Sequence, residues 1–204
     1  MQETFDGDGT MRLYHTGYLE IPTPDVHYGR KNADFGQGFY LTDSREFALR
    51  WARERRGEQV YVNQYALSLS GLRVRRFSRD EAWFDYIFQN RRGRPDGLAD
   101  FDVIMGPIAN DTLFNTFGIF TSGFLSREEA LPLLLVGPEH RQIALKTERA
   151  AAQLRFLSAQ ILPPVLLSQS REAFQKEEAA YQEALAQRME QTLSVQQEEK
   201  DIKR

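Results

Sequence analysis

The sequence contains no cysteine among its 204 residues and only three histidines, His15, His27 and His140. Disulfide bonds, thiolate metal ligands and cysteine nucleophiles are therefore excluded. The histidines do not have the close spacing typical of metal ligands, so no metal site is expected.

Long apolar runs are also missing from the sequence. No stretch approaches the length of a membrane-spanning helix, and none near the N-terminus resembles a signal peptide. We therefore expect a cytoplasmic protein with no membrane partner.

The length predicts one domain of ordinary size with an appendage. Hydrophobic residues make up 41% of the chain and aromatic residues 12%, which is enough to build a core. The expected domain spans residues 11–158, after a flexible lead-in of residues 1–10. A linker (159–170) and an amphipathic helix (171–204) are expected to follow.

The net charge of −3 says little by itself, but positive charge is concentrated between Arg50 and Arg94. This segment holds eleven arginines against five acidic residues, a local surplus of six. Such a surplus would attract an anion, such as a dinucleotide or a nucleic-acid backbone. A solvated basic face is the alternative interpretation.

The chain is organised around a glycine turn and the strand that follows it. Gly36 and Gly38 lie just ahead of the apolar run Phe39–Leu41, which predicts a short buried strand. The two glycines would let the backbone pass close to a neighbour at the start of this strand. A ligand-contacting loop is one use of such a turn, although two glycines alone indicate it only weakly.

A helix is predicted directly after this strand, over residues 44–56, with Asp43 and Glu46 available as a capping box. Ser78 is expected to cap a helix over 80–91, whose apolar stripe indicates a core position. Further helices are predicted at 126–135, 147–158 and 171–199, and further strands at 11–15, 60–69, 72–77, 101–105 and 141–146. Because strands and helices alternate irregularly, a mixed α+β fold with a partly antiparallel sheet is favoured over a doubly wound sheet.

The apolar stripe of the C-terminal helix is thin and drifts around the helix axis, so a strict coiled coil is not expected. The helix either packs on its own protein or offers a face to a partner, and we favour packing or self-association.

Two segments carry a resemblance to a known family. Leu13–Gly17 reads LYHTG and Phe35–Thr42 reads FGQGFYLT, the latter running into a helix. Together they resemble the ADP-ribosyltransferase superfamily, in particular its branch with a His–Tyr–acid arrangement, as in poly-ADP-ribose polymerases. Residues 100–111 and 141–147 fit the same pattern. The resemblance spans residues 11–156 and is closest to an uncharacterised bacterial domain family, often found as toxin-like genes.

This resemblance implies an α+β fold with a split, mixed or antiparallel sheet, flanking helices and here a C-terminal helical extension. It also implies roles for three positions. His15 would bond the adenosine ribose of NAD, backbone groups at Thr16 and Gly17 would hold the nicotinamide amide, and Tyr40 would stack on the nicotinamide ring. Without the resemblance, the expected interpretation of His15 is a buried core histidine, and that of Tyr40 is an ordinary aromatic residue in a strand.

The long loop between the two segments, residues 17–35, would close over the ligand. Arg30 or Lys31 in this loop would be available to a phosphate group. Gly38 is expected to belong to the same cofactor-binding set.

The third position departs from the family pattern, because Gln142 stands where an acidic residue is expected. A glutamine can bond a ribose hydroxyl, but it supplies no negative charge to a transition state that resembles an oxocarbenium ion. Two interpretations follow: an active transferase that uses Tyr40 and Gln142, or a nucleotide-binding module without turnover. Asp111 could supply the missing charge, although Asn110 and Asp111 could equally cap a helix.

The function expected from the resemblance is transfer of ADP-ribose from NAD to a macromolecular acceptor, with nucleic acid slightly favoured over protein. The setting would be a bacterial toxin or phage-defence effector, restrained by an antitoxin protein. One rival is the non-catalytic binding module, and another is an interaction protein that acts through residues 171–199.

Overall fold

The computed structural model describes residues 5–53, 55–108 and 139–202. The chain divides into two compact units, one of Met1–Ile108 with Glu139–Arg171 and one of Ala109–Pro138 with Glu172–Arg204. Asp111 and the helix predicted at 126–135 lie outside the described residues. The two sheets and the candidate site belong to the first unit.

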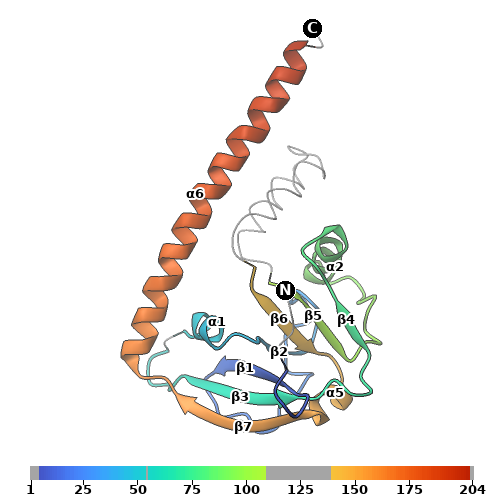
Figure 1. Ribbon diagram of the computed structural model, residues 1–204, viewed down its shortest axis with the longest axis vertical. Coiled ribbons are helices and arrows are strands. Elements are labelled where there is room, and N and C mark those ends of the chain that lie inside the picture. Colours follow the sequence, from blue (N-terminus) through green and yellow to red (C-terminus); the bar gives the residue numbers. More distant parts are fainter. Residues whose placement is uncertain (1–4, 54, 109–138, 203–204) are drawn as a thin grey trace. The chain divides into compact units, whose positions relative to one another are not determined.

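The first sheet contains three antiparallel strands. In order across the sheet they are β1 (Met11–Gly17), β3 (Tyr61–Leu67) and β7 (Leu154–Ile161). Figure 1 shows these strands side by side.

The second sheet contains four strands and is mixed, because its last two strands are parallel and its other neighbours antiparallel. In order they are β2 (Phe39–Leu41), β6 (Arg141–Leu145), β5 (Val103–Pro107) and β4 (Val74–Arg76). The predicted α+β fold with a split, mixed sheet is therefore confirmed.

The two sheets meet at β1 and β2. A pair of backbone hydrogen bonds links Tyr14 and Thr42, at N···O distances of 2.8 and 3.0 Å. This bridge holds the middle of β1 beside the residue that follows β2.

The main core contains side chains from both sheets. In β2 and β6 the core side chains alternate with others that point to the opposite face, as the pleat of a strand requires. The core members of these two strands are Phe39, Leu41, Ile143 and Leu145. Tyr40, Gln142 and Ala144 therefore lie on the second face of this sheet.

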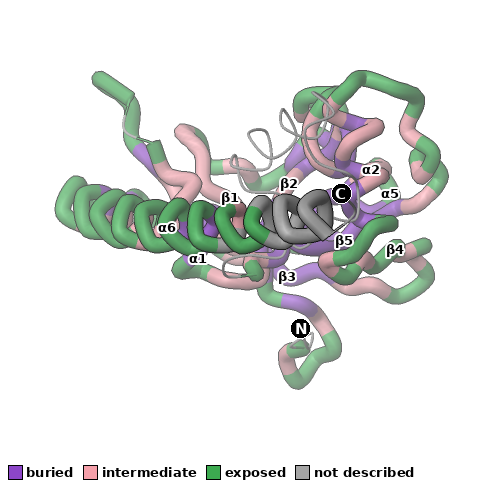
Figure 2. The backbone as a smooth tube through the Cα atoms, turned by 90° about the horizontal axis from the view of Figure 1, so that it is seen from above, coloured by how far each residue is buried: buried purple, intermediate pink, exposed green. Residues whose placement is uncertain are grey.

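The second face is covered by helix α2 (Glu81–Arg91), whose Trp83, Phe84 and Ile87 are buried as predicted. The Trp83 indole nitrogen donates to the carbonyl oxygen of Pro107 at 2.9 Å, which ties α2 to the end of β5. Figure 2 shows the buried residues gathered on the strands and on α2. The cap of α2 is Asp80, which accepts from the Trp83 amide, and not Ser78 as predicted.

Helix α1 (Arg45–Arg50) is shorter than predicted. Ser44 caps it by accepting from the amide of Phe47, and the predicted partner Asp43 instead pairs with Arg141 at 2.9 Å. The helix buries Phe47 and Ala48, and the half-buried Trp51 and Ala52 follow it without continuing the helix. Beyond Ala52, Arg53, Arg55 and Arg56 are charged and exposed, so a helix extended over them would gain little stability.

Helix α5 (Glu148–Ala152) begins at the predicted cap, Thr147, but the prediction that it continues to residue 158 is wrong. The chain enters β7 instead and pairs with the outer side of β3. Leu154 and Phe156 pack on the core from this strand. Tertiary pairing thus overrides the helix preference of an alanine-rich segment.

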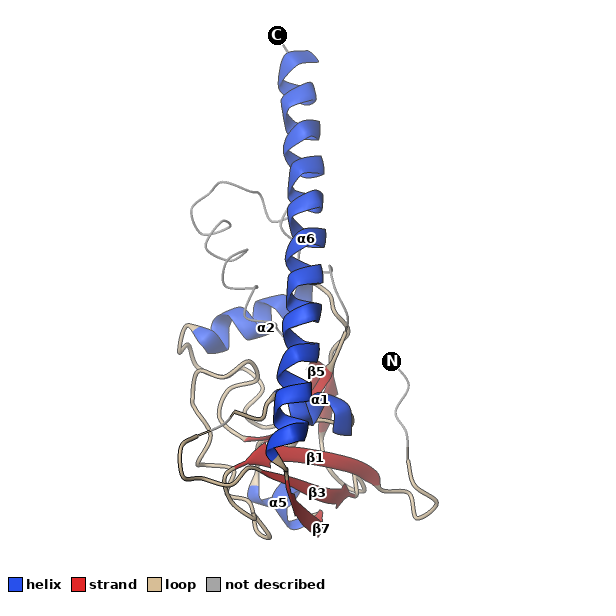
Figure 3. Ribbon diagram, turned by 90° about the vertical axis from the view of Figure 1, so that its left-hand side faces the viewer, coloured by secondary structure: helices blue, strands red, loops and turns tan. Residues whose placement is uncertain are grey.

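The expected linker at 159–170 is structured. Its first residues end β7, and helix α6 (Pro164–Ile202) begins at Pro164, a residue type that suits the first position of a helix. Figure 3 shows this helix as continuous. Leu167 packs with Val60 and Val62 in the first unit, and Tyr181 and Leu185, which belong to the second unit, are buried.

None of the helices in the described part of the chain combines the length and apolarity needed to cross a membrane.

Candidate functional site

The fold brings His15, Tyr40 and Gln142 onto three neighbouring strands, β1, β2 and β6. The Nδ1 atom of His15 lies 2.7 Å from the backbone oxygen of Tyr40. In the register of β2 and β6, Tyr40 faces Ala144, two residues from Gln142 on the same face of the sheet. These strands thus lie next to one another where the two sheets join, but the His15 ring packs on Phe39 on the core face, whereas the Tyr40 and Gln142 side chains lie on the second face.

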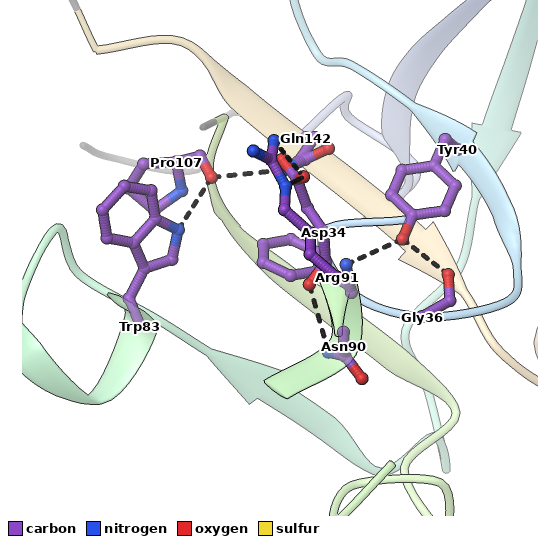
Figure 4. A network of polar contacts seen from close by, with 9 residues as sticks. Asp34, Gly36, Tyr40, Trp83, Asn90, Arg91, Pro107 and Gln142 are labelled. Atoms are coloured by element: carbon purple, nitrogen blue, oxygen red, sulfur yellow. Dashed lines mark hydrogen bonds and ion pairs between the residues drawn. The ribbon is translucent and has the colours of Figure 1, made fainter. Parts of the chain in front are cut away.

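The Tyr40 hydroxyl is held by the turn that precedes its strand. It accepts from the amide of Phe35 and donates to the carbonyl oxygen of Gly36, both at 2.8 Å (Figure 4). Burial raises the pKa of this hydroxyl far above its ordinary value, so it remains protonated. The hydroxyl therefore orders the turn, and the ring remains the part of Tyr40 that could contact a ligand.

Gln142 is buried at the start of β6, with 4% of its surface exposed. Its amide nitrogen donates to the Asp34 carboxylate at 2.9 Å and to the Pro107 carbonyl oxygen at 3.3 Å (Figure 4). Asp34 was not among the predicted site residues. Gln142 itself carries no charge, but the Asp34 carboxylate that contacts its amide places a negative charge beside it.

Asp34 is also paired with Arg91 at the end of α2. The Arg91 guanidinium contacts one carboxylate oxygen of Asp34, with its nitrogens at 2.6 and 2.7 Å. The side chains of Asp34 and Arg91 are only 12% and 15% exposed, so solvent screens this pair weakly. The neighbouring Asn90 donates to the backbone oxygen of Asp34 at 3.1 Å, which fixes the turn from the same helix.

A second buried charge pair lies on the other side of the turn. The ammonium group of Lys146 lies 2.8 Å from Asp96 and also donates to the backbone oxygen of Phe35. Burial lowers the pKa of Lys146, and Asp96 opposes that shift. The same carboxyl accepts from Tyr86 at 2.8 Å, so the turn from Asp34 to Gly36 is held by α2, β2 and the end of β6.

The structure explains why glycine occupies both positions 36 and 38 of the turn. Gly36 has φ of +73°, and a side-chain carbon there would lie 2.8 Å from the Lys146 ammonium and 2.9 Å from Asp96. A side-chain carbon at Gly38 would lie 2.6 Å from the backbone oxygen of Leu145, and one at Gly29 would lie 2.2 Å from that of Gly38. The predicted close approach thus involves the protein's own backbone, which accounts for Gly38 without a ligand.

His15 continues the inward-facing series of β1 and packs on the ring of Phe39, with 4.6 Å between ring centroids. Burial lowers the pKa of His15, so the ring is neutral at pH 7. Since the Tyr40 carbonyl can only accept, the proton lies on Nδ1 and leaves Nε2 as an acceptor. Residue 17 is a glycine, so no side chain lies against the Nε2 atom of His15 from that position. A side-chain carbon at position 17 would lie 3.4 Å from Nε2.

The remaining predicted residues occupy less constrained positions. The Thr16 hydroxyl donates to the Ala48 carbonyl oxygen at 2.6 Å, which ties β1 to α1. Arg30 and Lys31 are exposed, and Arg30 is near enough to the Tyr40 hydroxyl to lower its pKa against the dominant effect of burial.

Asp102 has a structural role. Its buried carboxylate accepts from the amide of Arg73, the hydroxyl of Thr147 and the guanidinium of Arg149. Burial alone would raise its pKa, but these donors outweigh burial and hold the pKa below its usual value.

Several arginines of the predicted basic segment are neutralised by acids from outside it. Arg50 pairs with Glu46 at 3.7 Å, Arg73 with Asp100 at 2.8 Å and Arg91 with Asp34. The exposed arginines of the segment include four on β4 and just after α2: Arg75, Arg76, Arg92 and Arg94. Two of these lie over aromatic rings, Arg75 over Phe77 at 4.8 Å and Arg92 over Phe88 at 4.5 Å.

Sequence reasoning missed Asp34, Arg91 and the Lys146–Asp96 pair. One signal was present for Asp34, an acidic residue two positions before Gly36, the first glycine of the turn. Within the described ranges, no group of three or more acidic or histidine side chains is arranged to hold a metal ion.

Residues 11–156 match the model of a family described as a protein of unknown function, DUF3990. Because this match covers more than half of the chain, the chain belongs to that family. No curated protein and no solved structure matches the chain at a significant level.

Proposed function

We propose that this protein is an NAD-dependent ADP-ribosyltransferase that transfers ADP-ribose to a macromolecule and releases nicotinamide. The observation that carries the proposal is the placement of His15, Tyr40 and Gln142 on the adjacent strands β1, β2 and β6, with His15 bonded to the Tyr40 backbone at 2.7 Å. These are the three positions to which the sequence resemblance assigns roles in holding NAD.

The chemistry of each group suits its proposed role. The Nε2 atom of neutral His15 can accept a bond from a ribose hydroxyl. The Tyr40 ring is half-buried and fixed through its hydroxyl, so it offers a preorganised surface on which a flat cationic nicotinamide can stack. The exposed Arg30, in the loop before Gly36, would attract the pyrophosphate.

Negative charge near Gln142 favours turnover over binding alone. Positive charge develops on the ribose when the nicotinamide bond breaks, and a fixed anion or dipole stabilises it. The Asp34 carboxylate touches the Gln142 amide and is shielded from solvent. A non-catalytic NAD-binding module remains the second candidate, since Arg91 compensates part of that charge.

For the acceptor we favour nucleic acid over protein, because exposed arginines lie over aromatic rings on β4 and α2. The proposed setting is a cytoplasmic toxin or phage-defence effector restrained by an antitoxin protein. Only the sequence resemblance supports that setting.

The test is incubation of the purified chain with adenylate-labelled NAD and a bacterial lysate, followed by separation of protein from nucleic acid. Tyr40→Ala is the test variant. Tyr61→Ala is the matched control, because Tyr61 is also a half-buried strand tyrosine but bonds only Gln59 through its hydroxyl. Label in one fraction that is lost only in Tyr40→Ala would support the transferase and identify the acceptor class. NAD binding without nicotinamide release would support the binding module.

A further inference from the structure

The orientation of the Gln142 amide is fixed by its neighbours. The two groups near its nitrogen, the Asp34 carboxylate and the Pro107 carbonyl oxygen, can only accept hydrogen bonds. A flipped amide would place its oxygen against two other oxygens, so only one orientation is chemically reasonable. Both amide hydrogens are therefore used within the protein.

The oxygen of the same amide is consequently the part of Gln142 that can interact with a ligand. Among the described residues, none donates a hydrogen bond to this Oε1 atom. The side chain lies on the face of the sheet that carries Tyr40 (Figure 4). A hydroxyl group placed beside Tyr40 would therefore meet an acceptor.

The two oxygens of Asp34 have separate partners. Oδ1 accepts both contacts from Arg91, while Oδ2 accepts from Gln142 at 2.9 Å. Arg91 thus holds the carboxylate in place without occupying the oxygen that contacts the glutamine. The Asn90 bond to the Asp34 backbone adds a further constraint.

A hydrogen bond to a carboxylate also changes the electronic character of an amide. The charge draws the amide hydrogen and makes the amide oxygen a stronger acceptor, an effect that is larger where solvent is excluded. Asp34 is 12% exposed and Gln142 is 4% exposed, so the effect is retained here.

We propose that Asp34 is a positioning residue for Gln142. It fixes the amide so that Oε1 accepts a hydrogen bond from a ribose hydroxyl of the dinucleotide, and it gives that oxygen added negative charge. The Asp34–Gln142 pair then provides the charge that glutamine alone lacks. This inference rests on the proposed transferase function.

The test measures nicotinamide release from NAD by the purified full chain, with kcat and KM determined separately. Asp34→Asn keeps the side-chain shape but removes the charge, and we expect kcat to fall by more than about tenfold with KM changed less than about threefold. Gln142→Glu alone places two carboxylates together, which raises the pKa of the pair and moves the pH profile to higher pH.

The decisive variant is the double substitution Asp34→Asn with Gln142→Glu. It moves the single negative charge from one residue to its neighbour and keeps the net charge beside Arg91 unchanged. We expect kcat to return to within about threefold of the wild-type value. Loss of packing or stability at position 34 would not be repaired by a charge at position 142.

Asp102→Asn is the matched control, because Asp102 is another buried aspartate paired with an arginine and has no contact with Gln142. Two outcomes would overturn the role of Asp34 while leaving the proposed transferase intact. In the first, the wild type releases nicotinamide and Asp34→Asn releases it equally fast. In the second, the wild type releases nicotinamide but the double variant has a kcat no higher than that of Asp34→Asn. No release from NAD by the wild type would instead overturn the proposed function and this inference together.

Discussion

The hydroxyl of Tyr40 donates to the carbonyl oxygen of Gly36, four residues earlier, at 2.8 Å. The same hydroxyl accepts from the amide of Phe35, so one side chain closes the turn that leads into its own strand. Two properties of Tyr40 can therefore be separated: its hydroxyl orders the turn, and its ring is the proposed surface for nicotinamide.

Tyr40→Phe tests this separation. Loss of the hydroxyl leaves a partly buried amide and carbonyl without their partner, so we expect the free energy of unfolding to fall by about 1–3 kcal/mol. Nicotinamide release should persist because the ring remains, whereas Tyr40→Ala should abolish it. Denaturant unfolding and release assays on both variants provide the measurement.

Tyr65→Phe is the control for this prediction, since Tyr65 is buried and donates its hydroxyl to the Ile21 carbonyl oxygen in the core. It should lose stability but release nicotinamide like the wild type. If Tyr40→Phe were folded and as inactive as Tyr40→Ala, the ring alone would not account for the role of Tyr40.

Gly36→Ala tests the crowding around the turn. Gly36 has φ of +73° and would place a methyl group against the Lys146–Asp96 pair. Gly71 has the same φ of +73° but nothing within 4 Å of that position. Gly71→Ala therefore measures the backbone strain alone, expected to be about 1 kcal/mol.

We expect Gly36→Ala to lose at least about 2 kcal/mol more than Gly71→Ala in denaturant unfolding, because the added carbon displaces a buried ion pair. Equal losses in the two variants would mean that the charged side chains move aside freely. The turn would then be less constrained than its contacts indicate.

Elements whose local pattern agrees with their tertiary setting were predictable. The strand β2 was predicted from its apolar run, and the buried stripe of α2 from its helical spacing. The helix predicted over 147–158 was wrong after residue 152, because pairing with β3 decides that segment. Nothing local in an alanine-rich sequence reports such a partner.

The candidate site was predictable only in part. His15 and Tyr40 came from a resemblance, and the structure brings them together through a backbone contact. Asp34 contacts Arg91 across 57 positions and Gln142 across 108 positions in the chain. A single sequence contains no signal that pairs residues so far apart, so the charge beside Gln142 could be found only from the fold.

The Lys146–Asp96 pair predicts how stability depends on pH. Burial alone would raise the pKa of Asp96, but its bonds from Lys146, Leu98 and Tyr86 outweigh burial and lower it from 3.8. Below about pH 4 the Asp96 carboxyl is therefore protonated in the unfolded chain but still ionised in the folded protein. The free energy of unfolding falls as the solution is acidified through this range. Denaturant midpoints measured between pH 7 and pH 2.5 should show this loss.

Asp96→Asn should weaken this acid dependence and lower stability at pH 7, because it leaves Lys146 buried without its counter-ion. Without Asp96, burial lowers the pKa of Lys146 unopposed, so the variant should regain stability as pH rises toward 10. Asp100→Asn is the control, as its ion pair with Arg73 is exposed and should contribute little. An Asp96→Asn variant with the wild-type pH dependence would show that this pair does not govern acid stability.

The exposed arginines of β4 and of the segment after α2 lead to the last prediction. Replacing Arg75, Arg76, Arg92 and Arg94 with glutamine removes four positive charges that a nucleic-acid backbone would attract. We expect labelling of a nucleic-acid acceptor to fall by at least about tenfold and its salt dependence to become shallower, because fewer counter-ions are released on binding. Nicotinamide release in the absence of acceptor should not change. The control replaces three exposed arginines, Arg12, Arg45 and Arg155, which bond Asp6, Gln160 and Asp8 elsewhere on the first unit, and the two sets are compared per charge removed. Equal effects of the two sets would show only a general response to net charge, and no effect of the first set would favour a protein acceptor.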